Sequence, residues 1–518
     1  MFKPCDLCGK ITAINMKSSF HLLIAVFALI PFSLTAQIQK PGVYIEEINK
    51  FPPSIADVET AIPVFIGYTE KADLHAAGDL RFVARRIKSL LEFEQFYGRD
   101  FGVSFSKVQL DNTNKVIAAE PVSAQYLLYY SMQQFYANGG GNAYIISIGG
   151  YGSPLLPADF IRGLDVAERE DEPTLLAFPD AVNLPGNSLY TVQQKALQQA
   201  DKLMDRFCVF DIKYATDKTS HDQVVAEFRN NIGNSQLKYG AAYTPFLNAG
   251  VMSSAVSYYQ WKNVLWLGTN RITLSQLTTD PAIIAKIAAL ENMSPTDPAY
   301  KQREKELGQA FPVMKNISDA LKSLPRMLPP SAAICGVYSS VDRDRGVWKA
   351  PANVVVNNVR GLAVTITDRD QETLNVDATA GKSINVIRAF TGRGNLVWGA
   401  RTLMGNDNEW RYVSVRRFFN LVEESVKKGT MPFVFEPNDA NSWTKIKGMI
   451  ENYLTLKWRS GALAGAKATE AFFVQVGVPQ TMTAQDVLEG RMIVEIGMAV
   501  VRPAEFIIFR FSIKTQTN

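Results

Sequence analysis

The side chains that most often carry out catalysis are few in this chain of 518 residues. Histidine occurs only at His21, His75 and His221, so neither a histidine-rich metal site nor an HExxH zinc helix can be built. No G-x-S-x-G motif is present. The Gly-Lys-Ser run at 381–383 lacks the earlier glycine of a phosphate-binding loop, because Val376 stands there. The sequence therefore offers no recognisable site for zinc-dependent hydrolysis, serine acyl transfer or nucleotide hydrolysis.

Four cysteines and one acidic run are the remaining candidates for metal binding. Cys5 and Cys8 have the spacing of half a zinc knuckle, but no second pair follows. Cys208 and Cys335 lie in apolar, strand-like segments, where we expect buried free thiols. The acids within 168–172 are more typical of a solvated loop than of a cation site.

We therefore expect no metal site, no cofactor and no catalytic residue. A glycoside hydrolase stays open as an alternative, because carboxylates are abundant and their separation in space cannot be read from the sequence. The net charge of +4 is small for this length and does not favour nucleic-acid binding as the main activity. With 47% hydrophobic residues, the chain is long enough for two to four domains.

The hydrophobic pattern predicts an α/β architecture. Residues 62–68 are typical of a buried strand, and a helix over 125–137 is followed by a glycine-rich turn and a strand over 143–148. From Thr174 to Tyr243 the pattern alternates strand, helix, strand, helix, strand, which predicts at least partly parallel strands. Residues 273–324 are expected to be largely helical.

Two long helices are predicted late in the chain. The first begins near Arg411 and ends at 427–429, and its charged residues are expected on solvated faces. The second runs over about 442–459 with one apolar side, and its polar surface is basic. The cations assigned to that surface are Lys445, Lys447, Lys457 and Arg459.

Both ends of the chain carry short apolar strands that require partners. Lys40–Ile48 is a strand stopped by the prolines after Phe51, and Pro503–Thr517 is unusually apolar for a terminus. Such strands either complete a sheet of their own subunit or are donated to a neighbouring subunit. The pattern does not separate these two arrangements.

Several motifs resemble the contractile tail sheath family of phages and related injection systems. They are KPGVYIEEI at 40–48, LPPSAAICGVYSSVDRDRGVWKAPAN at 328–353, and, in the family's order, GNLVWGARTL, WRYVSVRRFFNLVEESV, FVFEPND, LKWRSGALAGAKATEAFFVQVG and VVRPAEFIIFRF within 385–513. The resemblance implies a structural subunit without enzymatic activity, which polymerises helically around an inner tube and contracts. Its implied partners are copies of itself, the tube protein, and baseplate and terminator or cap proteins.

The resemblance also implies roles for individual residues. Neighbouring subunits would be joined through strands of both arms, at Val43, Tyr44, Ile45, Glu46, Phe506, Ile507, Ile508, Phe509 and Phe511. The helix over 442–459 would face an acidic tube through Lys445, Lys447, Lys457 and Arg459. We expect an N-terminal arm over 37–60, inserted domains over 61–150 and 151–330, a sheath module over 331–502, and a C-terminal arm over 503–518.

The segment Met16–Ala36 disagrees with a sheath, because its lysine, apolar run and small residues before Gln37 have the layout of a secretory signal. Three interpretations stay open: a signal peptide starting at Met16, a translational start placed too early, and an uncleaved extension. We predict that the native polypeptide lacks the residues before Met16. Assembly in the cytoplasm is implied by the family, and the alternative is an exported surface or binding protein that reuses the fold.

Overall fold

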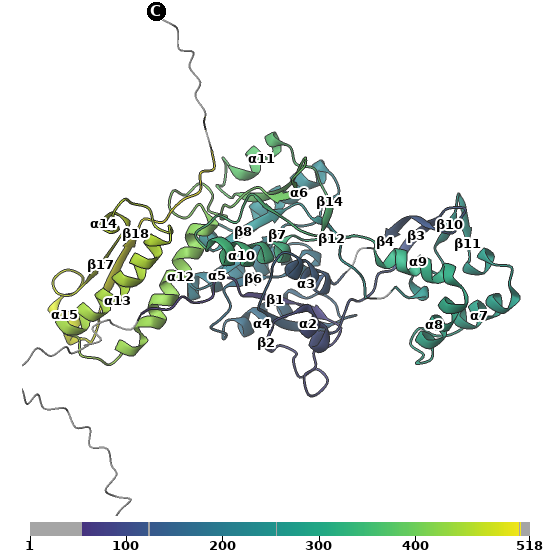
Figure 1. Cartoon of the computed structure of the whole chain (residues 1–518), viewed down its shortest axis with the longest axis horizontal. Helices are drawn as coiled ribbons and strands as arrows, with labels where there is room; N and C mark the ends of the chain where they lie inside the picture. Colours follow the sequence, from purple (N-terminus) through teal and green to yellow (C-terminus); the bar gives the residue numbers. More distant parts are fainter. Residues whose placement is uncertain (1–53, 123–124, 255, 507, 509–518) are drawn as a thin grey trace, which may run out of the picture. The chain divides into compact units, whose positions relative to one another are not determined.

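A computed structural model describes residues 54–122, 125–254, 256–506 and 508 of the chain. Its largest sheet has nine strands, drawn at the centre of Figure 1. Their order across the sheet is β13 (Val354–Val355), β16 (Gly394–Val397), β15 (Ile384–Phe390), β8 (Gly240–Thr244), β7 (Phe207–Asp211), β6 (Leu175–Ala177), β1 (Pro63–Thr69), β5 (Ala143–Gly150) and β2 (Ala84–Ile87).

The six central strands, from β15 to β5, are parallel, and antiparallel strands complete both edges. In the register, Phe65 of β1 lies between Ile145 of β5 and Ala177 of β6. All seven residues of β1 are buried. A parallel strand covered on both faces is apolar throughout, which explains the unbroken hydrophobic runs of the sequence.

Helices cover both faces of this sheet. One face packs against α3 (Leu128–Ala137) and α10 (Ser331–Arg345), where Phe65, Phe135 and Val337 share a core. The other face packs against α4 (Pro157–Ala167), α5 (Ser188–Leu203) and α6 (Lys218–Asn231), where Ile66 and Phe160 share a second core. The predicted α/β class and the alternation over 174–243 are therefore confirmed, and so are the predicted helices of 273–324.

Smaller sheets and helices surround this centre. A four-stranded sheet has the order β11 (Asn270–Ile272), β10 (Leu265–Leu267), β3 (Phe105–Leu110) and β4 (Val116–Pro121), and a three-stranded sheet has the order β12 (Arg326–Leu328), β9 (Leu247–Ala249) and β14 (Val359–Leu362). Further helices are α2 (Leu90–Tyr97), α7 (Pro281–Glu291), α8 (Tyr300–Ala310), α9 (Pro312–Lys322) and α11 (Asp368–Asn375).

The late part of the chain forms a helical pair against a hairpin, which we call the late module. It comprises α12 (Val413–Thr430), α13 (Ala440–Arg459), the short helices α14 (Ala468–Ala471) and α15 (Ala484–Leu488), and the antiparallel pair β17 (Phe472–Val476) and β18 (Val494–Met498). Phe418 of α12, Ile450 of α13 and Val474 of β17 are buried in one core. Ile55 belongs to the same core, although it lies more than 360 residues away in the sequence.

The nine-stranded sheet takes strands from all three of the domains predicted over 61–502, whose boundaries stay a prediction. One prediction made from the sequence is wrong. Cys335 lies in helix α10 rather than in a strand. Gly336 allows helix α10 to pack closely against α3. A Cβ atom at Gly336 would lie 2.5 Å from the carbonyl oxygen of Phe135. Both Cys208 and Cys335 are buried free thiols, as predicted.

Candidate inter-subunit site

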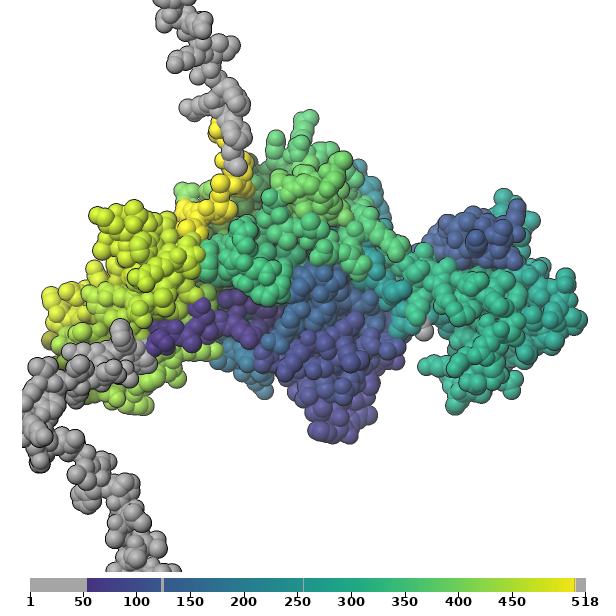
Figure 2. All heavy atoms as spheres, viewed as in Figure 1, coloured from purple at the N-terminus to yellow at the C-terminus, as the bar shows by residue number. Residues whose placement is uncertain are grey.

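The segment that leads from the N-terminal arm is bound to the late module. The Ile55 side chain is 6% exposed. Asp57 accepts a hydrogen bond from the Tyr453 hydroxyl (2.7 Å) and forms an ion pair with Lys457, and the Val58 N–H donates to Ser425 Oγ (3.1 Å). Figure 2 shows this segment in purple against the yellow-green late module. The arm is therefore held by α12 and α13 from residue 55 onward.

A buried ion pair joins the same segment to helix α10, which covers one face of the central sheet. Arg417 of α12 donates two hydrogen bonds to the carboxylate of Asp342 in α10, at 3.0 and 2.5 Å. Thr60 donates to that carboxylate (2.6 Å) and accepts from Arg417 through its carbonyl oxygen (2.8 Å). Burial is the largest single influence and would lower the pKa of Arg417, but the charge of Asp342, its hydrogen bonds and smaller contributions from Tyr338 and Cys335 together raise the pKa.

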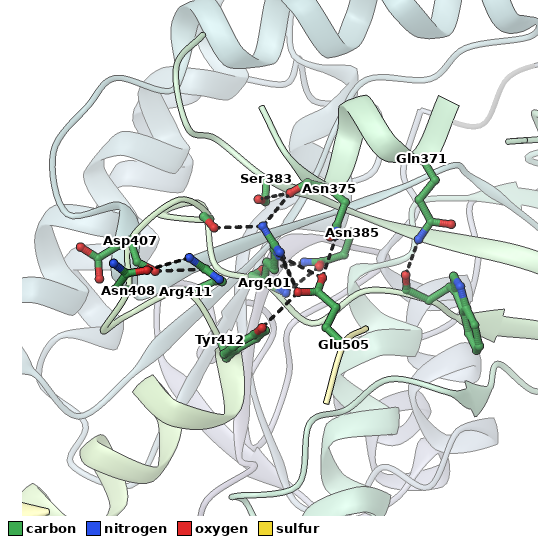
Figure 3. Close-up of polar contacts among 12 residues, drawn as sticks. Gln371, Asn375, Ser383, Asn385, Arg401, Asp407, Asn408, Arg411, Tyr412 and Glu505 are labelled. Atoms are coloured by element: carbon green, nitrogen blue, oxygen red, sulfur yellow. Dashed lines mark hydrogen bonds and ion pairs between the residues drawn. The ribbon is translucent and has the colours of Figure 1, made fainter. Parts of the chain in front are cut away.

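The C-terminal arm leaves the body at a second cluster, drawn in Figure 3. The Glu505 carboxylate accepts three contacts from Arg401, at 3.0, 3.3 and 2.6 Å. It also accepts the Tyr412 hydroxyl (3.0 Å) and the Asn375 side-chain amide (2.7 Å). Charged, bidentate pairs of this kind are the strong class of hydrogen bonds, and we call this cluster the Glu505 anchor.

The groups of the Glu505 anchor are fixed by the secondary structure around them. Arg401 pairs with Tyr412 in an isolated bridge just before α12, and Asn375 is the last residue of α11. The Arg401 side chain is 4% exposed and that of Glu505 is 21% exposed. Burial alone would raise the pKa of Glu505. The hydrogen bonds from Arg401 and Asn375 and the charge of Arg401 together lower the pKa by more than burial raises it, so the carboxylate is ionised well below neutral pH.

Beyond the anchor the chain presents apolar side chains to solvent. Phe506 is 71% exposed and Ile508 is 79% exposed. Large apolar side chains that are exposed next to each other are typical of a surface covered by a partner. Of the other predicted strand contacts, Val43, Tyr44, Ile45, Glu46, Ile507, Phe509 and Phe511 lie outside the described residues.

The four predicted tube-facing cations do not share one surface of α13. Lys445 and Arg459 are exposed, Lys447 is partly exposed beside Glu451, and Lys457 is 9% exposed in its ion pair with Asp57. At 100° per residue, position 457 falls in the middle of the apolar side of the helix, and 445 and 459 fall on the opposite side. The prediction of a solvated surface is therefore wrong for Lys457.

The prediction for the charged residues of α12 also needs correction. Arg416, Arg417 and Glu424 are buried rather than solvated. The Arg416 guanidinium packs 4.4 Å from the ring centre of Trp410 and donates to Asn420 at 2.8 Å. A cation can be buried when aromatic rings and hydrogen bonds replace its water.

No cluster of three or more His, Cys, Asp or Glu that could hold a metal is found among the described residues. His221 is buried, its Nε2 lies 2.8 Å from the Thr244 hydroxyl, and burial lowers its pKa. Within the described part of the chain, no helix combines the length and apolarity needed to cross a bilayer.

Comparison with solved structures decides the family. The helical sheath of the anti-feeding prophage in its contracted state is 30% identical, with a TM-score of 0.59, over 91% of this chain and 98% of that one. The chain belongs to the contractile tail sheath family. A second sheath subunit, from the contracted PVC sheath complex of an extracellular contractile injection system, is 28% identical with a TM-score of 0.57, over 91% of this chain and 97% of that one.

Sequence comparisons agree with this assignment. Residues 405–514 of the sheath subunit match the model of the phage tail sheath C-terminal domain. A putative prophage major tail sheath protein of Pseudomonas aeruginosa is 25% identical over 243 residues, which are 44% of this chain. The match spans 58% of the length of that relative. The matched domain includes α12, α13 and two residues of the Glu505 anchor, Tyr412 and Glu505, whereas Arg401 and Asn375 precede it.

Sequence reasoning missed the residues that hold the C-terminal arm. Arg401, Tyr412, Asn375 and Glu505 come from four separate segments, and so do not form a motif of fixed spacing. The available signal was an arginine directly after the apolar run at 396–400, since an arginine placed there must find a carboxylate or carbonyl partner.

Proposed function

We propose that this chain is a non-enzymatic subunit of a contractile sheath that polymerises helically around an inner tube. Contraction of the polymer would drive the tube through a target envelope. The observation that supports this most is the 30% identity to a contracted helical sheath along nearly the whole length of both chains. Contacts of two different surfaces, repeated by a screw operation, give an open filament of this kind.

The arms would join neighbouring subunits by strand exchange. A donated strand forms backbone hydrogen bonds with a neighbour's sheet, and these bonds survive rotation of the rigid bodies that they connect. Both arms leave the described body at well-bonded positions, Asp57 and Glu505, so a pull on an arm would be transmitted to α12, α13 and the central sheet. Contraction then needs no nucleotide, provided that the contacts between subunits are more favourable in the contracted sheath than in the extended one.

The partners we propose are copies of the chain, the tube protein, and baseplate and cap proteins. We propose assembly in the cytoplasm. The signal-like segment Met16–Ala36 favours the alternative of an exported binding protein. Mass spectrometry of the N-terminal peptide from native cells tests the proposed start, and peptides that contain Cys5 and Cys8 would contradict it.

Truncation after Glu505 tests the strand-exchange function. Removal of 506–518 keeps the anchor but removes the apolar strand, so we expect a folded, soluble subunit that no longer forms filaments in electron micrographs. A matched control replaces only Lys514–Asn518, which follow the apolar residues, with a Gly-Ser tail. Full-length filaments from the truncated chain would refute strand donation, and a misfolded truncated chain would show that the strand completes its own sheet.

A further inference from the structure

Five parallel strands of the central sheet have the order that creates a ligand crevice in other doubly wound folds. Across the sheet these strands stand in the order β5, β1, β6, β7, β8. Numbered by their position in the chain, this is the order 2-1-3-4-5. Helix α3, which lies between β1 and β5 in the chain, and helix α5, which follows β6, cover opposite faces of the sheet. The order of the strands across the sheet reverses between β1 and β6, and a crevice is expected there at the carboxyl ends of the strands.

Asp180 occupies that position. It lies in η1 (Pro179–Asn183), just after β6, and is fully buried. One carboxylate oxygen accepts the backbone N–H groups of Leu127 (2.5 Å) and Leu128 (2.9 Å), at the N-terminus of α3. The other oxygen accepts the N–H of Tyr68 at the end of β1 (2.7 Å).

The surroundings are built around this carboxylate. A Cβ atom at Gly67 would lie 2.5 Å from its oxygen, so only glycine leaves the space it occupies. Helix α3 has no side-chain cap from Leu127, the residue before it, and Asp180 supplies the acceptor instead. Three converging backbone N–H groups at a strand end and a helix start are the donor set that other folds offer to a bound anion.

We propose that the crevice between β1 and β6 is an anion site that the chain fills with its own carboxylate, and that the site accepts a small monocarboxylate such as formate once the Asp180 side chain is removed. Asp180 thus acts as a tethered ligand that fastens α3 and β1 to β6. The site is separate from both arm anchors, so the inference does not depend on strand exchange.

Rescue by formate tests this inference on the unassembled full-length subunit. We expect Asp180→Ala to lower the thermal midpoint, and sodium formate to raise that midpoint by about 2 °C or more over sodium chloride of equal ionic strength. Formate should leave the midpoint of the wild-type chain unchanged relative to chloride. The rise should saturate with formate concentration, as binding to one site requires.

Asp79→Ala is the matched control. Asp79 also accepts three backbone N–H groups, from Leu74, His75 and Ala76, but it is exposed, so its removal leaves no enclosed site. An equal response of the two variants to formate would overturn the proposal. If Asp180→Ala is recovered only unfolded, refolding in formate and in chloride is compared: folded protein from formate alone supports the proposal, and failure in both salts overturns it.

Discussion

Replacing Glu505 with alanine should loosen the Glu505 anchor without unfolding the body. The change leaves the guanidinium of Arg401, 4% exposed, without its carboxylate. Loss of one partner of a buried ion pair costs about 3–5 kcal/mol, and the 21% exposure of Glu505 reduces this by solvent screening, so we expect about 2–3 kcal/mol. Glu505→Gln keeps an acceptor oxygen and should cost about 1 kcal/mol.

Hydrogen exchange at Thr402 measures this change locally. Its N–H donates to the carbonyl oxygen of Arg411 (2.8 Å), beside the bridge between Arg401 and Tyr412. If the anchor limits local opening, its loss should speed exchange by about 30- to 150-fold, which corresponds to the expected free energy. Glu409→Ala, at an exposed acid nearby, is the control and should leave the rate unchanged. Exchange in Glu505→Ala within threefold of the control would refute the reasoning.

Three further predictions concern the buried charges and the exposed cations. Arg417→Met should lower the free energy of unfolding in urea by about 3–5 kcal/mol, because it leaves Asp342 buried without a cation, and adding Asp342→Leu should recover most of the loss. Burial raises the pKa of Asp211 to about 7, above its unfolded value, so its contribution to stability is fullest below about pH 4 and is lost as the pH rises through 7. The gain in thermal midpoint of Asp211→Asn over wild type should therefore increase from pH 4 to pH 7.5. Glutamate at both Lys445 and Arg459 should leave the thermal midpoint nearly unchanged but prevent co-assembly with tube protein, as seen by electron microscopy.

Each of these predictions has an outcome that contradicts it. A double variant at 417 and 342 that is no more stable than Arg417→Met would show that the ion pair is not the cause. A constant difference between Asp211→Asn and wild type across pH would mean that Asp211 does not titrate in this range. Tube-filled particles from the Lys445 and Arg459 variant would remove the tube-facing role, and Lys322→Glu, on helix α9, is its control.

Patterns within single segments made much of the fold predictable. The apolar runs that became β6, β7 and β8 alternate with amphipathic stretches, and short turns leave few ways to connect them other than as parallel strands. Pairing over long separations was not readable. The contact of β8 with β15 joins residues about 140 positions apart, and no local signal fixes it.

The candidate site was predictable only in part. The apolar character of the C-terminal arm indicated a strand that needs a partner, and Phe506 and Ile508 are exposed, but their contact with a neighbouring subunit stays a prediction. The placement of Lys457 on a solvated surface was wrong, because the helical angle puts this residue among the apolar positions of α13. Arg401 and Glu505 escaped notice because a pair 104 residues apart is brought together only by the finished fold.

The contact between Asp57 and Lys457 also sets an order of events during synthesis. These residues are 400 positions apart, so at about 5–20 residues per second the ribosome needs roughly 20–80 s to supply the partner of Asp57. Until then Asp57 lacks its contact with α13, although Thr60 of the same segment already has its partner Asp342. A chain that terminates before Lys457 never forms the contact between Asp57 and Lys457.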